Sequence, residues 1–172
     1  PPYYPAWKVD PAYAGLRYQR EMRNGVDVMR APLWVPARPS GLKRVLHLAS
    51  FALTSIGWLV RQAKWRPDVI FIVEPPLFCS PAALLFARLT NAKIWLHIHD
   101  YEVDAAFELG LLKGKWLRRM ATALERFVLT RFDHVSSISN AMVALARRKG
   151  ADDSRLTMLP NWLDLQGLAR RS

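Results

Sequence analysis

The chain has 172 residues, of which 51% are hydrophobic and 23% are charged, a composition that excludes a disordered protein and fits one globular domain. Its single cysteine, Cys79, excludes an internal disulfide framework and a zinc site built on several cysteines, and it indicates a reducing compartment. The net charge of +11 predicts an anionic partner, namely a nucleic acid, an acidic lipid surface or a phosphorylated substrate.

The positive charge is concentrated in two segments. Residues 28–67 carry seven basic residues and no acid, which gives +7. Residues 109–132 carry six basic residues and one acid, which gives +5, so the rest of the chain sums to −1. In both segments the basic residues are interleaved with Leu, Phe and Trp, a pattern that favours a membrane surface over a nucleic-acid backbone. No apolar run reaches the roughly 18 residues that span a bilayer.

The first half of the chain begins with residues 1–24, which lack clear periodicity and predict a loop with a short helix near residues 14–22. Residues 25–33 include alternating valines and predict a strand. Ser40 is a candidate N-cap for a helix that extends to about Lys64. The run VIFIV at residues 69–73 predicts a parallel strand that is buried on both faces.

The second half alternates predicted helices and strands. Pro81 fits the first turn of a helix, Gly114 divides a longer helical segment, and Ser139 and Gly150 mark the two ends of a third helix. The predicted elements are a helix at 80–90, a strand at 93–99, a helical segment at 109–130, a strand at 134–138, a helix at 140–149 and a strand at 156–159.

This alternation predicts an α/β fold with a Rossmann-like, doubly wound parallel sheet. In such sheets, ligands bind beyond the carboxyl ends of the strands. Four strand ends carry unusual side chains here, so the candidate site lies among them. They are Glu74-Pro75-Pro76, the segment His97–Asp100, the segment Ser136–Ser139, and Pro160-Asn161.

The segment from His97 to Glu102 contains two imidazoles and two carboxylates. On a strand, His97 and His99 point to the same side. A metal site is one interpretation, because imidazole and carboxylate suit zinc or manganese, but the sequence offers no second cluster of such ligands. A substrate-contacting or acid–base role for His99, with Asp100 beside it, is the favoured interpretation. The alternative is that both side chains cap the loop.

Three other strand-end residues are candidates for substrate binding. Glu74 is placed to orient a sugar hydroxyl or, alternatively, to cap the turn that follows its strand. Ser137 and Ser139 offer hydroxyl groups at a helix N-terminus, which suits an anion, although an ordinary helix cap is the simpler explanation. The sequence contains no GxGxxG, GxxxxGK[ST] or GxSxG motif.

Several longer stretches resemble bacterial exopolysaccharide glycosyltransferases of family 4, most closely those of colanic acid biosynthesis. The resemblance covers nearly the whole chain, and WLHIHDYEVDAAFELG is its most specific motif, whereas PNWLDL is shared more widely within family 4. The stretches are LKRVLHLAS (42–50), PDVIFIVEPPLFCSPAALL (67–85), WLHIHDYEVDAAFELGLLK (95–113), and FDHVSSIS followed by LPNWLDL (132–165).

The resemblance implies the N-terminal half of a GT-B fold, in which two Rossmann-like domains enclose the active site. Residues 1–165 would form the acceptor-side domain, and residues 166–172 would begin the linker to a donor-binding domain outside this sequence. The family's first strand and its Gly-rich loop would precede residue 1. The 172 residues alone are therefore expected to transfer no sugar.

The resemblance also implies a retaining transfer of a hexosyl or fucosyl group from a nucleotide sugar to a lipid-linked glycan, with no obligatory metal or other cofactor. His99 and Asp100 match the family's strand-end motif at the catalytic cleft. Asn161 matches the start of the family's N-x-x-D motif at the crossing to the donor domain, and Asp164 matches its end.

The expected location is cytoplasmic, at the inner face of the plasma membrane, with the segments 40–64 and 109–132 bound to anionic lipid and no nucleic-acid partner. A missing first strand would leave a neighbouring strand unpaired and favour a homodimer or aggregation. Two other functions stay open, a basic nucleic-acid-binding module and a non-catalytic domain of a polysaccharide assembly complex. Packing of segment 40–64 into a core is the alternative to its membrane role.

Overall fold

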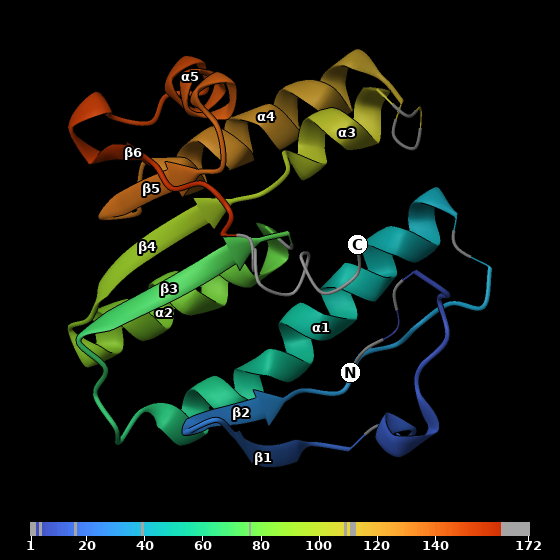
Figure 1. The fold of residues 1–172 in the computed structure, drawn as a ribbon. Helices are drawn as coiled ribbons and strands as arrows, with labels where there is room; N and C mark the ends of the chain where they lie inside the picture. The colour runs from blue at the N-terminus through green and yellow to red at the C-terminus, as the bar shows by residue number, and fades with distance from the viewer. Residues whose placement is uncertain are drawn as a thin grey trace, which may run out of the picture.

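The computed structural model describes residue 3 and residues 5–15, 17–38, 40–75, 77–108, 110 and 113–162 (Figure 1). The strands are β1 (Gln19–Arg23), β2 (Val26–Arg30), β3 (Val69–Glu74), β4 (Lys93–Ile98), β5 (His134–Ser137) and β6 (Leu156–Met158). The α-helices are α1 (Gly41–Gln62), α2 (Ser80–Thr90), α3 (Glu102–Glu108), α4 (Lys115–Leu129) and α5 (Asn140–Arg148). Short 3-10 helices lie at Pro11–Tyr13, Leu77–Cys79 and Asp153–Arg155.

The first two strands form an antiparallel hairpin that is separate from the main sheet (Figure 1). Asn24 and Gly25 connect the strands and have φ angles of 49° and 81°, the positive values that a two-residue type I′ turn requires. The helix predicted near residues 14–22 is therefore wrong. The strand predicted at residues 25–33 exists as β2, but it pairs with β1 and not with the parallel sheet.

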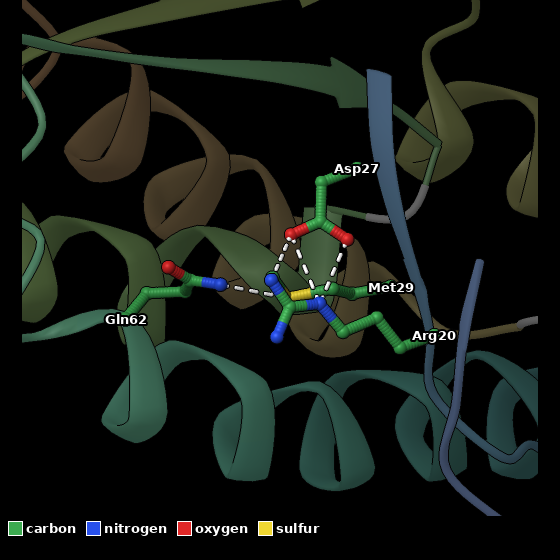
Figure 2. A network of polar contacts seen from close by, with 4 residues as sticks. All are labelled: Arg20, Asp27, Met29 and Gln62. Atoms are coloured by element: carbon green, nitrogen blue, oxygen red, sulfur yellow. Dashed lines mark hydrogen bonds and ion pairs between the residues drawn. The ribbon is translucent and has the colours of Figure 1, made fainter. Parts of the chain in front are cut away.

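Polar contacts fix the hairpin and join it to α1 (Figure 2). The guanidinium of Arg20 on β1 donates to both carboxylate oxygens of Asp27 on β2, at 2.7 to 3.0 Å. The side-chain amide of Gln62, at the end of α1, donates to the sulfur of Met29. This hydrogen bond joins the hairpin to the C-terminal end of α1.

The main sheet has the strand order β3-β4-β5-β6, with every pair parallel. The register places Ile72, Leu96 and Val135 side by side on one face. Val73, His97 and Ser136 are side by side in the next row, on the opposite face. The Rossmann-like α/β class with a parallel sheet is confirmed.

Helices α2, α4 and α5 cover the face of the sheet that carries Leu96. The buried core joins Leu96, Ile98 and Val135 to Ala87 on α2, to Val128 on α4 and to residues of α5. Burial of an aliphatic side chain of this size stabilises a fold by about 1.5–3 kcal/mol, so this layer is the main source of stability.

The opposite face is open at β3. Val69, Phe71 and Val73 on β3 are each about half exposed, and the outer edge of β3 has no strand partner among the described residues. The prediction that residues 69–73 are buried on both faces is therefore wrong, although the strand is parallel as predicted. The helices α2, α4 and α5 cover only the other face of the sheet, which leaves these three side chains exposed.

Helix α1 confirms the helix predicted from Ser40 to Lys64. Ser40 occupies the N-cap position, but its side chain makes no capping hydrogen bond there. The helix packs against α2 and the 3-10 helix that follows β3, and it buries only His47 and Ala52. One face of α1 remains exposed and apolar along the whole helix, with Leu42, Leu46, Leu53, Ile56 and Val60.

Within the described residues, no helix combines the length and the apolarity needed to cross a bilayer.

Candidate functional site

The candidate site lies at the carboxyl end of the parallel sheet, where the predicted residues gather. Glu74 and Ser137 are the last residues of β3 and β5, and His99 and Asp100 directly follow β4. Asn161 follows β6 and is exposed. Parallel pairing brings all of these strand ends to one edge of the sheet.

His99 and Asp100 are both exposed to solvent. The backbone N–H of His99 donates to the carbonyl oxygen of Glu74 at 3.0 Å, which fixes the main chain at this point. The His99 ring is nearly perpendicular to the ring of His97, at 88°, with 4.6 Å between the ring centroids. An exposed imidazole beside a carboxylate can orient a hydroxyl group or exchange a proton with it.

Glu74 differs from the expectation, because its side chain is only 1% exposed and lies on the helix-covered face of the sheet. Its Oε1 atom is buried and has no hydrogen-bond partner among the described residues. Burial, followed by the charges of Glu102 and Glu125, raises the pKa of Glu74 to about 9, so the group is a neutral acid at pH 7. Contact with a sugar hydroxyl stays a prediction, and the burial of this carboxyl argues against it.

The raised pKa makes the stability of the fold depend on pH. A carboxyl that keeps its proton in the folded state stabilises that state fully below its unfolded pKa of about 4.3, and this contribution is lost as pH rises toward the folded value. Between these limits the loss approaches about 1.4 kcal/mol per pH unit. Glu74→Gln mimics the neutral acid. We therefore expect the free energy of unfolding of the variant, relative to that of wild type, to be higher at pH 8 than at pH 5.5 by at least about 1 kcal/mol in urea unfolding.

Glu108→Gln is the matched control, because Glu108 is an exposed carboxyl at the end of α3. The difference in free energy of unfolding between Glu108→Gln and wild type should be the same at pH 8 as at pH 5.5. Parallel stability curves for wild type and Glu74→Gln would show that Glu74 is ionised in the folded protein at neutral pH.

Glu102 is a residue of the site that sequence reasoning did not single out. It begins α3, and its Oε2 atom accepts a hydrogen bond from the backbone N–H of Leu77 at 2.7 Å. Burial raises the pKa of Glu102, the hydrogen bond from Leu77 lowers it, and the charge of Asp100 raises it further. Glu102, and not Glu74, therefore holds the turn after β3. Its carboxylate, within the segment from His97 to Glu102, was the available signal.

The hydroxyl groups of the two serines are used locally. Ser137 is buried, and its Oγ donates to the carbonyl oxygen of Ile98 on β4 at 2.6 Å. Ser139 Oγ accepts from the backbone N–H of Met142 at 3.3 Å, so this residue is the N-cap of α5. The structure thus shows the helix cap that was the simpler explanation, and anion binding at Ser139 stays a prediction.

Two further expectations concern a metal site and the linker at the end of the chain. No three His, Cys, Asp or Glu side chains in the described part of the chain come together as a metal-holding group, which leaves the metal interpretation of His97 and His99 without support there. Asp164 and the linker expected at residues 166–172 lie outside the described residues.

Comparison with known proteins assigns the chain to a family. The glycosyl transferase 4-like domain matches residues 6–162. The chain belongs to this family. It is also 46% identical over 168 residues to the Escherichia coli (strain K12) protein named "Putative colanic acid biosynthesis glycosyl transferase WcaI". That alignment covers 96% of this chain and 41% of the relative, so the chain spans about two fifths of the relative's length.

The family match confirms the resemblance seen in the sequence. It covers both basic segments, the four-stranded sheet and every strand end of the candidate site. His99, Asp100 and Asn161 therefore lie within the matched region, on the exposed side of the strand ends.

Proposed function

We propose that the chain is the acceptor-side half of a glycosyltransferase of exopolysaccharide synthesis. The enzyme would transfer a hexosyl or fucosyl group from a nucleotide sugar to a lipid-linked glycan. The observation that carries this proposal is the family match over residues 6–162, supported by the printed name of the E. coli relative. The nucleotide sugar would be held by a donor-binding domain outside these residues, so the 172-residue chain alone would transfer no sugar.

In this proposal the catalytic residues are His99 and Asp100, at the exposed end of β4. A retaining transfer builds positive charge at the sugar carbon while negative charge develops on the leaving phosphate. The His99 imidazole would orient the sugar or the acceptor hydroxyl, and Asp100 would lie beside it at the same strand end. No metal step is needed for these two roles, and Asn161 would contact the substrate near the crossing between the domains.

A transfer assay tests the proposed function. The complete gene product is incubated with a panel of radiolabelled nucleotide sugars and a lipid extract that contains the glycan acceptor. We expect label to enter the lipid fraction with one sugar of the panel and with retained anomeric configuration. Absence of transfer with every donor, or retention of the protein on DNA with a steep salt dependence, would contradict the proposal and favour the nucleic-acid alternative.

Helix α4 supports a membrane surface as a further partner. Trp116, Met120, Leu124 and Phe127 project from α4 and are each more than half exposed. Basic residues lie beside this apolar stripe, and four of them line or border one surface hollow of about 490 Å³. None of the four forms an ion pair with a described residue. They are Lys115, Arg118, Arg119 and Arg126.

The one acid on α4, Glu125, is buried and faces Lys149, so it does not offset the exposed positive charge. Aromatic and aliphatic side chains next to arginine are the pattern of helices that lie in the plane of a membrane interface. We therefore assign anionic lipid at the inner face of the plasma membrane, with the protein on the cytoplasmic side, as the partner of α4.

Vesicle flotation measures this interaction. Each basic side chain near an anionic leaflet contributes about 1 kcal/mol. The double substitution Arg119→Glu with Arg126→Glu should therefore lower binding to anionic vesicles by at least about 100-fold, because it removes two attractions and adds two repulsions. Binding to neutral vesicles should be weak for both proteins.

Arg147→Glu is the control, since Arg147 is exposed and belongs to α5, not to α4. Leu53→Ser separates the roles of the two basic segments. A loss of binding with Leu53→Ser would add α1 to the membrane surface, whereas unchanged binding would favour packing of the apolar face of α1 against other polypeptide. Equal binding of wild type to neutral and anionic vesicles would contradict the proposal.

Self-association of the 172-residue chain stays a prediction. The free edge of β3 and its half-exposed side chains Val69, Phe71 and Val73 support it, because an exposed apolar edge strand can pair with another chain.

A further inference from the structure

Hydrogen-bonded side chains join β4 to β5 on the face of the sheet opposite helices α2, α4 and α5, next to His99. Trp95 Nε1 donates to Ser136 Oγ at 2.8 Å, and His97 Nδ1 lies 2.8 Å from the same oxygen. In the parallel register, His97 is directly opposite Ser136. Ser136 is fully buried and His97 is 5% exposed, so solvent does not compete for these bonds.

The donors and acceptors of this group determine where its protons lie. The indole N–H of Trp95 can only donate, so Ser136 Oγ accepts from it. The hydroxyl of Ser136 then needs an acceptor, and His97 Nδ1 is the partner that the described residues provide. Donation from Ser136 to Nδ1 places the proton of a neutral His97 ring on Nε2. Burial and the neighbouring His99 also lower the pKa of His97, which favours this neutral form.

The His97 ring is in turn in contact with His99. Phe71 on β3 stacks on His97 at an interplanar angle of 26°, with 5.7 Å between centroids. His99 is perpendicular to His97 at 4.6 Å. The His97 ring is thus held by Ser136, supported by Phe71 and packed against the ring of His99.

The geometry points to His97 as a positioning residue for His99, with Ser136 as the group that fixes the tautomer and orientation of His97. This inference rests on the proposed catalytic role of His99.

Imidazole spectra of the 172-residue chain test the hydrogen bond independently of activity. Long-range ¹H–¹⁵N spectra at pH 7.5 should show wild-type His97 as a single tautomer with its proton on Nε2. In Ser136→Ala, His97 should become a mixture of both tautomers, and the signals of His99 should shift. Thr157→Ala is the matched control, because Thr157 Oγ1 bonds His134 Nε2 at 3.0 Å on the same sheet, one strand further from His99. It should change only the signals of His134.

Turnover of the complete transferase tests the positioning role. A misplacement of about 1 Å can cost about 100-fold in rate, so we expect Ser136→Ala to lower kcat by between about tenfold and about 100-fold, with KM within about twofold. Ser136→Thr keeps the hydroxyl and should recover most of kcat, and Thr157→Ala should match wild type. If circular dichroism shows that Ser136→Ala is unfolded, His97→Phe, which lacks the nitrogen that Ser136 holds, should show the same loss of kcat.

The outcomes separate this inference from the proposed function. A wild-type His97 with mixed tautomers, or spectra unchanged by Ser136→Ala, would overturn the assignment of the hydrogen bond. Normal turnover of Ser136→Ala in an enzyme that needs His99 would overturn the positioning role alone. If the complete wild-type protein transfers no sugar, the proposed function fails and the positioning role fails with it, whatever the spectra show.

Discussion

Replacement of His99 by alanine in the complete transferase is expected to lower kcat by about 100-fold or more, the lower range for loss of a positioned acid–base group. The fold should survive, because the His99 side chain is exposed and contributes nothing to the helix-covered core. The hydrogen bond from its backbone N–H to Glu74 does not depend on the side chain and remains in the variant. The loss should therefore appear in kcat and not in thermal stability.

His134→Ala is the control for this substitution. His134 lies on β5, and its ring packs against Trp95, with 4.7 Å between the centroids. Its loss should leave kcat within about twofold of wild type, since His134 lies at the amino end of β5 and the candidate site lies at the carboxyl ends of the strands. Wild-type turnover in the His99 variant, with a normal circular dichroism spectrum, would show that the imidazole is not catalytic and would move attention to Asp100.

Local chemistry explains why several elements were predictable from the sequence. Helix α2 begins at Ser80 with Pro81 in its first turn, as expected from the fixed φ of proline. Helix α5 is capped by Ser139 and is followed by Gly150, whose φ of 104° few other residues adopt. In each case the signal lies within a few residues of the boundary that it sets.

Two elements were missed for different reasons. The hairpin was missed because its first strand, β1, is too charged to show alternation, although the valines of β2 predicted a strand and Asn24-Gly25 is a strong turn sequence. Helix α3 has seven residues, too few to show a helical period, and it is held by contacts from Glu102 and Asp104 to other parts of the chain.

The sequence predicted that the candidate residues gather at the strand ends, and they do, but it did not predict how their side chains are oriented. Glu74 and Ser137 share a row on the covered face of the sheet, whereas His97 and Ser136 share a row on the open face. Alternation along each strand predicts that neighbours point to opposite faces. Which face the helices cover depends on the order of the strands in the sheet, and this order is set by contacts distant in sequence. The burial of Glu74 therefore could not be predicted from the sequence around it.

The buried lysine Lys149 is expected to be the largest single polar contributor to stability. Its Nζ atom lies 2.5 Å from Glu125 on α4 and 2.8 Å from Asp104 on α3, and its side chain is only 8% exposed. It also lies 5.2 Å from the centre of the Tyr101 ring. Burial lowers the pKa of Lys149, but hydrogen bonds to Asp104 and Glu125 raise it more, so the net direction is upward and the amine is charged. One cation thus joins α3 and α4 to the end of α5.

Lys149→Met keeps the length of the side chain but leaves Glu125, which is 2% exposed, as a buried carboxylate without a cation. Removal of one partner of a buried pair costs about 3–5 kcal/mol, a large part of the roughly 5–15 kcal/mol that stabilises a typical domain. Urea unfolding at pH 7.5 should show this loss. The control is Arg147→Met, which removes the exposed ion pair between Arg147 and Asp153 and should cost less than about 1 kcal/mol. Equal losses for the two variants would mean that Glu125 takes up a proton when Lys149 is removed, and that the charge of Lys149 is not what holds the three helices together.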